Sequence, residues 1–181
     1  DMAAIVAEMG VPFVVHAEDR EMIEYWTPRG RRKGSGYDDF LDSRPEFGEV
    51  AVTAMACRLA GYTGAAVHLA HVALAEAVNV IRQARKAGWP VTAETCPPYL
   101  FLTSDDYGAL GTTMKVLPPI RDGDDQNQLW RALAEGWIDI VATDHAPHLE
   151  EDKAGDIWEA AAGALGVETW LPLMLEAARQ G

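Results

Sequence analysis

Short apolar runs that end in metal-capable side chains constrain this chain more than any other feature. The run VPFVV is followed by His16, AAVHLA by His71, and WIDIVAT by Asp144. Each run has the length of a buried strand, and helix-length stretches separate the runs. Continuous apolar strands that alternate with helices are typical of a parallel sheet covered by helices, so we expect an α/β fold.

The same pattern predicts where the elements lie. Strands are predicted at residues 11–15, 65–70, 90–93 and 138–142. Helices are predicted at residues 3–9, 18–26, 46–62, 73–87, 124–135 and 167–179, with a short helical turn at 105–110. Residues 27–42 are rich in glycine and charge and are expected to form a long surface loop. Residues 112–116 are a candidate extra strand.

Four strand–helix units are about half of an eight-unit barrel, which typically needs ~250 residues. In such a barrel the carboxyl ends of the strands meet at one rim, so His16, His71 and Asp144 are expected to converge there. We therefore expect residues 1–181 to form one partial domain, the C-terminal half of a (β/α)8 barrel that is truncated at both ends. An independent doubly wound sheet of four strands is the alternative.

Composition excludes some classes of partner. The net charge of −13 argues against a basic patch for nucleic acid and against attraction to anionic membranes. The two cysteines, Cys57 and Cys96, cannot build a disulfide framework, so a reducing cytoplasm is expected. No apolar stretch reaches the roughly 18 residues of a membrane-spanning helix.

The residue types at the strand ends suit metal chemistry. A neutral imidazole such as that of His16 or His71 binds zinc, and the carboxylate of Asp144 can bind a metal and accept a proton. His68 lies three residues before His71 and is assigned to packing or to support of the site. His148 lies far enough along the last loop to contact a substrate. Each residue alone has a commoner structural explanation, such as a capping aspartate or a surface histidine.

Taken in order, the segments resemble a known family. VVHAED, AVHLAHVA, TAETCPPYL and ATDHAPH are similar to the motifs of strands five to eight in the cyclic-amide branch of the amidohydrolase superfamily. This branch contains the dihydroorotases, the allantoinases and the dihydropyrimidinases, or hydantoinases. The resemblance implies a binuclear metal site, usually zinc, in which His16 and His71 hold one ion and Asp144 the other. It also implies a small cyclic-amide substrate and a homo-oligomer.

The resemblance further implies a mechanism and a limit. A hydroxide shared by the two ions attacks the ring amide, and Asp144 serves as general base and then as general acid. The family's His-x-His pair and carboxylated lysine come earlier in the chain order than His16. The segment by itself is therefore expected to be inactive.

The subfamily signals point in different directions. HAED and TDHAPH resemble dihydroorotases, in which the residue matching His148 contacts the substrate carboxylate. Leu117, in KVLPP, stands where that family usually has a substrate-binding asparagine, while SRP and PPIRD resemble allantoinases and hydantoinases. Ala162 and Gly163 match the loop after the eighth strand and would offer backbone contacts to the ring. We expect a dihydroorotase-like hydrolase, with an allantoinase- or hydantoinase-type enzyme as one alternative and a non-catalytic barrel scaffold as another.

Overall fold

The computed structural model describes residues 2–180. Its strands are β1 (Phe13–Val15), β2 (Val67–Leu69), β3 (Val91–Thr95) and β4 (Ile140–Val141). Its α-helices are α1 (Met2–Met9), α2 (Arg20–Lys33), α3 (Tyr37–Asp42), α4 (Glu46–Thr63), α5 (Ala75–Lys86), α6 (Pro97–Phe101), α7 (Tyr107–Leu110), α8 (Gly123–Ala134), α9 (Glu150–Lys153) and α10 (Trp170–Gln180). Two 3-10 helices, η1 (Ser104–Asp106) and η2 (Gly111–Met114), flank α7.

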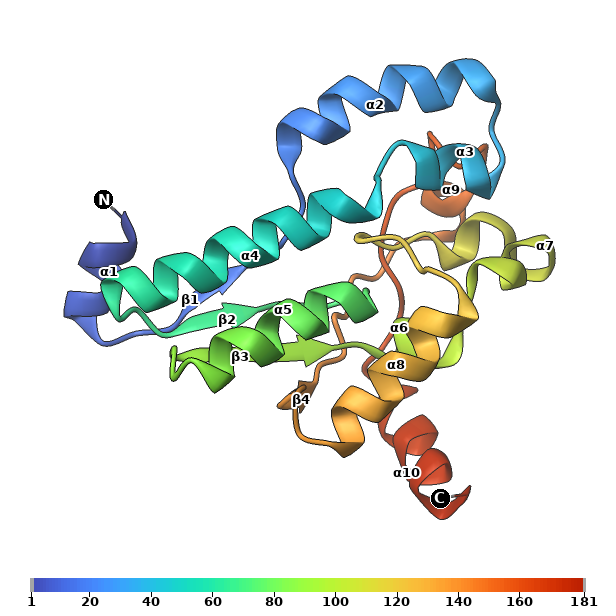
Figure 1. The fold of residues 1–181 in the computed structure, drawn as a ribbon. Helices are drawn as coiled ribbons and strands as arrows, with labels where there is room; N and C mark the ends of the chain where they lie inside the picture. The colour runs from blue at the N-terminus through green and yellow to red at the C-terminus, as the bar shows by residue number, and fades with distance from the viewer. Residues whose placement is uncertain (1, 181) are drawn as a thin grey trace.

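The four strands form one parallel sheet in the order β1-β2-β3-β4. Val14 pairs with His68, and His68 pairs with Thr92, so the strand ends are in step. Helices α4, α5 and α8 cover one face of this sheet (Figure 1). The predicted alternation of parallel strands and helices is therefore confirmed. Parallel neighbours in sequence order, with helices on one side, are the arrangement of part of a (β/α)8 barrel.

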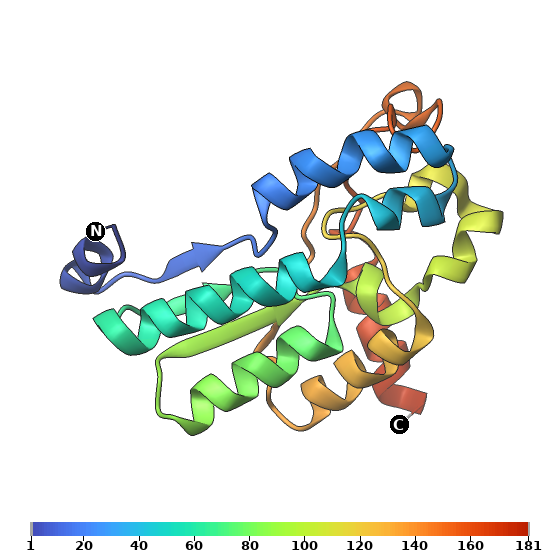
Figure 2. The same ribbon diagram turned by 45° about the horizontal axis from the view of Figure 1, so that its top comes forward.

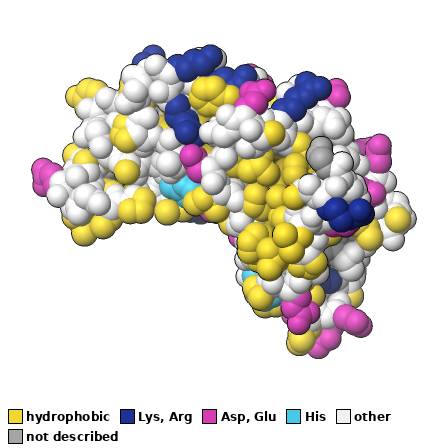
Figure 3. All heavy atoms as spheres, turned by 90° about the horizontal axis from the view of Figure 1, so that it is seen from below, with side chains coloured by type: hydrophobic (Ala, Val, Ile, Leu, Met, Phe, Trp, Pro, Cys, Tyr) yellow, Lys and Arg dark blue, Asp and Glu magenta, His cyan; other side chains and the backbone are white. Residues whose placement is uncertain are grey.

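The two faces of the sheet differ in burial. On the helix-covered face, Val67, Leu69 and Ala93 are almost fully buried. On the other face, Val14 is 59% exposed and Ile140 is 47% exposed. Viewed from below, the molecule is arched, and hydrophobic and histidine side chains lie in the hollow of the arch (Figure 3). In a closed barrel, this uncovered face would be the interior.

The covering helices follow from the sequence pattern. Helix α5 buries Ala77, Val78, Ile81 and Ala84, which share one face at helical spacing. Gly64 ends α4 in the left-handed conformation, with φ 75°, which glycine adopts without a steric cost. Across residues 2–180, no helix combines the length and the apolar character needed to cross a bilayer.

The prediction of a long loop at residues 27–42 was wrong. Helix α2 continues through Pro28 to Lys33, and α3 follows after a short turn. The glycine at position 30 serves close packing, because a Cβ there would lie 2.5 Å from the Asp39 carbonyl oxygen and 2.8 Å from Trp158 Cη2. Figures 1 and 2 show α2, α3 and α9 together beyond the carboxyl ends of the strands.

Two smaller corrections concern the segments that follow α7 and β3. Residues 112–116 do not form a strand, since η2 occupies 111–114 and Val116 then enters the core. The segment after β3 forms the helix α6, which sequence analysis did not predict. Pro97 and Pro98 occupy the first turn of α6, where the missing N–H groups have no helical partner to lose.

Candidate active site

Two histidines meet at the carboxyl ends of β1 and β2. His16 follows β1 directly, and His71 lies two residues beyond β2. Their ring nitrogens, His16 Nδ1 and His71 Nε2, are 3.0 Å apart although the residues are 55 positions apart in sequence. Two nitrogens that each bind one zinc ion at roughly 2.0–2.1 Å with tetrahedral angles lie roughly 3.3 Å apart. The pair therefore fits two ligands of a single ion.

A buried carboxylate orients His16. Glu18 Oε2 lies 2.9 Å from His16 Nε2 and accepts a second hydrogen bond, of 2.6 Å, from Arg44 Nη1. Burial acts to raise the pKa of Glu18, but the bonds and charges of His16 and Arg44 outweigh it, so the pKa is lowered and the carboxylate stays ionised. A carboxylate on one ring nitrogen leaves the other free to bind a metal. Here that other nitrogen, Nδ1, faces His71.

His71 is suited to remain a neutral ligand. It is 9% exposed, and burial together with the nearby His16 lowers its pKa, while Asp144 acts in the opposite direction. A neutral imidazole offers a lone pair, whereas the protonated form offers none. The charge of Asp144 acts on His71 but is outweighed by burial and by His16.

The backbone is unusual at two of the predicted ligands. Within residues 2–180, the only non-glycine residues with positive φ are His71, at 38°, and Asp144, at 44°. Non-glycine residues in this region are costly and cluster at functional sites. Asp144 itself is exposed, and the described residues contain no group of three or more His, Cys, Asp or Glu side chains close enough to hold an ion. The structure thus brings His16 and His71 together, and among the described residues it does not bring Asp144 into contact with them.

His68 lies on the uncovered face of the sheet. Its Nδ1 is 2.8 Å from Thr92 Oγ1, and its Nε2 is 3.2 Å from Glu94 Oε2. Its side chain therefore lies on the face that would be the interior of the barrel, and not beneath the helices.

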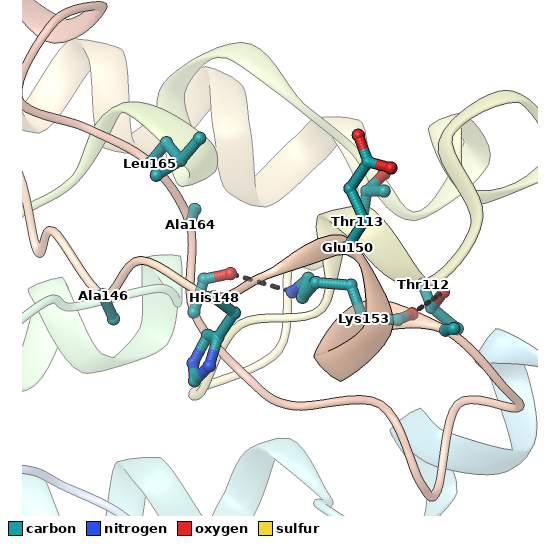
Figure 4. Close-up of a pocket in the computed structure, with 10 residues that line it drawn as sticks. Thr112, Thr113, Ala146, His148, Glu150, Lys153, Ala164 and Leu165 are labelled. Carbon is teal, nitrogen blue, oxygen red and sulfur yellow. Dashed lines mark hydrogen bonds between the residues drawn. The ribbon is translucent and has the colours of Figure 1, made fainter.

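Two of the four predicted substrate-contacting residues, His148 and Gly163, line a second feature, a cavity of about 550 Å³ (Figure 4). His148, Lys153 and Gly163 line it, and His148 Nε2 is 3.0 Å from the Ala162 carbonyl oxygen. Leu117 is partly buried against the core and is not among the described lining residues. The cavity and the histidine pair are separate features, joined through the segment from Asp144 to His148.

Several residues of the site were missed by sequence analysis. Glu18 lies in the HAED motif and Arg44 in SRP, but nothing in the sequence shows that they meet. Lys153 gave no signal, because a lysine at the end of an acidic helix is usually a surface residue.

Comparisons with known proteins cover nearly the whole chain. No protein-family model matches the sequence of this chain. An allantoinase of Solibacter usitatus is 38% identical over 173 residues, which are 94% of this chain and 38% of that protein. An allantoinase of Escherichia coli is 35% identical over 176 residues, which are 97% of this chain and 39% of that protein. The L-hydantoinase (dihydropyrimidinase) from Arthrobacter aurescens has a TM-score of 0.95 and 34% identity over 99% of this chain and 41% of its own. The chain is a homologue of the cyclic-amide hydrolases of the amidohydrolase superfamily.

This homology confirms the predicted superfamily. A second solved structure, the D-hydantoinase from Bacillus sp. AR9, has a TM-score of 0.92 and 30% identity over 99% of this chain. The chain spans about two fifths of the length of these relatives. With its parallel strands and alternating helices, this coverage is consistent with the predicted C-terminal portion of a (β/α)8 barrel.

Proposed function

We propose that the protein containing this chain is a metal-dependent hydrolase that opens a cyclic amide. The observation that carries the proposal is the convergence of His16 Nδ1 and His71 Nε2 at 3.0 Å. Positive φ at both His71 and Asp144 supports it, because strain of this kind concentrates at functional residues. His16 and His71 would hold one zinc ion, and Asp144 would bind a second.

The residues of the chain have distinct roles in this proposal. When bound, the metal polarises the amide carbonyl and makes water a stronger nucleophile. Asp144 accepts the proton of the attacking water and returns it to the ring nitrogen as the C–N bond breaks, because an unprotonated amide nitrogen is a poor leaving group. Glu18 holds the His16 ring in place, and Arg44 keeps Glu18 ionised. His148, Ala162 and Gly163 would contact the ring; His148 and Gly163 line the cavity, and Ala162 adjoins Gly163.

The ring is proposed to be a ureide or hydantoin in preference to dihydroorotate. Leu117 has an apolar side chain packed against the core, so it offers no hydrogen bond to a substrate. The curated and solved relatives named above are allantoinases and hydantoinases. Dihydroorotate remains the alternative because of the HAED and TDHAPH motifs.

The experiment uses the complete open reading frame that encodes this chain. The purified protein is assayed with allantoin, hydantoin and dihydroorotate in parallel, and its metal content is measured. We expect ring opening of at least one substrate, loss of turnover with a chelator, and recovery on addition of zinc. A protein that holds no metal and opens none of the rings would contradict the proposal and favour the scaffold alternative.

Two variants separate the roles of the ligands. Asp144→Asn should retain much of the metal and lose turnover by roughly a hundredfold or more, because the proton acceptor is removed. His71→Ala should lose metal as well as turnover. Asp38→Asn, an exposed position on α3, is the matched control and should behave as the wild type. Near-normal turnover of Asp144→Asn would refute the role of Asp144 as a base.

A further inference from the structure

Four consecutive backbone carbonyls, from Ala160 to Gly163, all face basic side chains. Lys115 Nζ donates to the Ala160 carbonyl, and His148 Nε2 is 3.0 Å from that of Ala162. Lys153 Nζ donates to the carbonyls of Ala161, at 3.0 Å, and Gly163, at 2.8 Å. We call residues 160–163 the carbonyl turn. Figure 4 shows the Lys153 ammonium group hydrogen-bonded to a backbone carbonyl among the residues that line the cavity.

All three N–H donors of the Lys153 ammonium group bind backbone carbonyl oxygens. An ammonium has three N–H donors, and the third donates to the Lys115 carbonyl at 3.0 Å. Lys153 is only 9% exposed, and among residues 2–180 it forms no ion pair with a carboxylate. Burying a cation without a counter-charge is costly. Through its one nitrogen, Lys153 joins α9 to Lys115 and to the carbonyl turn. This is a positional role.

The position of Lys153 is itself held. Thr112 Oγ1 donates to the Lys153 carbonyl at 2.6 Å, which ties the end of α9 to η2. Gly163 N donates to the Lys115 carbonyl at 2.9 Å. A Cβ on Gly163 would lie 2.6 Å from the Ala146 carbonyl oxygen, so the carbonyl turn packs closely against the loop after β4. Helix α9, η2 and the loop after β4 are therefore joined by hydrogen bonds and close packing in one wall of the cavity.

One donor of the carbonyl turn is left over. The N–H of Ala161 donates to Asp152 and that of Gly163 to Lys115, while the N–H of Ala162 has no partner within the described residues. In a trans peptide, C=O and N–H point in opposite directions. Because the Ala161 carbonyl faces Lys153, the Ala162 N–H points away from Lys153. A cyclic amide or ureide carries carbonyl oxygens that such a donor can bind.

We propose that Lys153 is a positioning residue for substrate binding: its ammonium fixes the carbonyl turn, whose backbone contacts to the ring, through Ala162 and Gly163, belong to the proposed function. This inference rests on the proposed function for the identity of the ligand. The role of Lys153 in holding the carbonyl turn, which we call the clamp, rests only on the hydrogen bonds of Lys153. Because the clamp acts on binding and not on proton transfer, its loss should raise KM more than it lowers kcat.

The test compares Lys153→Met with Lys33→Met in the complete protein. Methionine keeps the length of the side chain but has no donor, and Lys33 is an exposed surface lysine on α2. We expect Lys153→Met to raise KM roughly tenfold, to change kcat by less than roughly threefold and to keep the metal content of the wild type. Hydrogen exchange in the peptide covering residues 160–166 should become faster, and Lys33→Met should change neither measurement.

A second variant guards against misfolding. Lys153→Arg keeps the charge, but its planar fork cannot reach three carbonyls arranged around one nitrogen, so KM should again rise. An unchanged KM in both variants, or unchanged exchange at 160–166, would overturn the inference. If the wild-type protein opens no ring, the proposed function fails, and hydrogen exchange still decides whether Lys153 holds the carbonyl turn.

Discussion

Glu49 is a buried carboxyl group next to the loop that carries His71. It is 3% exposed, and its Oε1 accepts a hydrogen bond of 3.0 Å from Ala73 N. Its Oε2 is buried and has no partner within residues 2–180. Burial raises the pKa of Glu49 to about 8, although the Ala73 N–H and the charge of Arg121 oppose the shift. Glu49 is therefore a protonated acid at neutral pH.

This shift predicts a pH dependence of stability. Between its ordinary pKa of 4.5 and the folded value of about 8, the folded state holds one more proton than the unfolded state. The free energy of unfolding therefore falls as pH rises through this window, on the order of 1 kcal/mol per pH unit. Glu49→Gln is neutral at all pH values and should lack this contribution. Denaturation midpoints of wild type and variant at pH 5, 6 and 7 measure it.

The control for this prediction is Glu46→Gln, an exposed position in the first turn of the same helix. It should keep the slope of the wild type. If Glu49→Gln follows the same slope as the wild type, Glu49 is ionised in the folded protein and the assignment is wrong.

Single residues were predictable where the sequence motif itself contains the metal-binding side chain. His16 and His71 end apolar runs, and this placement alone predicted that they would meet. Glu18 and Arg44 were not predictable as a pair, because their contact depends on how α2 and α4 are placed after β1. Lys153 was not predictable at all, since its partners are backbone carbonyls and no side-chain pattern records them.

At the scale of elements, helix α2 shows where local signals mislead. Residues 27–42 are rich in glycine and charge, and this composition predicted a loop; Gly30 is one of these helix-weakening glycines. Tertiary packing reverses this preference, because Gly30 allows α2 to approach the backbone of Asp39 and the ring of Trp158. By contrast, α5 was predicted within two residues at each end, since its apolar spacing and Gly88 agree with its tertiary role. Elements whose local and tertiary signals agree are the ones that sequence analysis finds.

This interpretation predicts opposite effects of the same substitution at two glycines. Gly30→Ala places a Cβ against the Asp39 carbonyl and should cost about 1–3 kcal/mol through overpacking, less the roughly 0.5–1 kcal/mol that alanine gains in a helix. At Gly108 in α7, a Cβ meets nothing within 4 Å, so Gly108→Ala should be neutral or stabilising. Thermal melting of both variants measures the difference. Equal melting temperatures would show that Gly30 is not a packing contact.

At the scale of the whole molecule, the sheet face that no helix covers determines how the segment should behave in solution. Val14 and Ile140 are exposed on this face, while the opposite face lies under α4, α5 and α8. Parallel sheets normally have both faces covered, and a large apolar patch with open strand edges promotes association. This chain spans about two fifths of the length of the relatives, and four strand–helix units are half of a (β/α)8 barrel.

Residues 1–181 expressed alone should therefore self-associate through this face. The double variant Val14→Lys, Ile140→Lys places charge on the uncovered face and should lower the associated fraction by roughly threefold or more. The matched control is Met55→Lys, Tyr62→Lys, which adds the same charge at exposed positions of α4. Analytical ultracentrifugation at several concentrations measures the distribution. A monodisperse wild-type segment with a sharp melting transition would contradict the partial-barrel interpretation, and an equal effect of both double variants would assign association to net charge instead of to the sheet face.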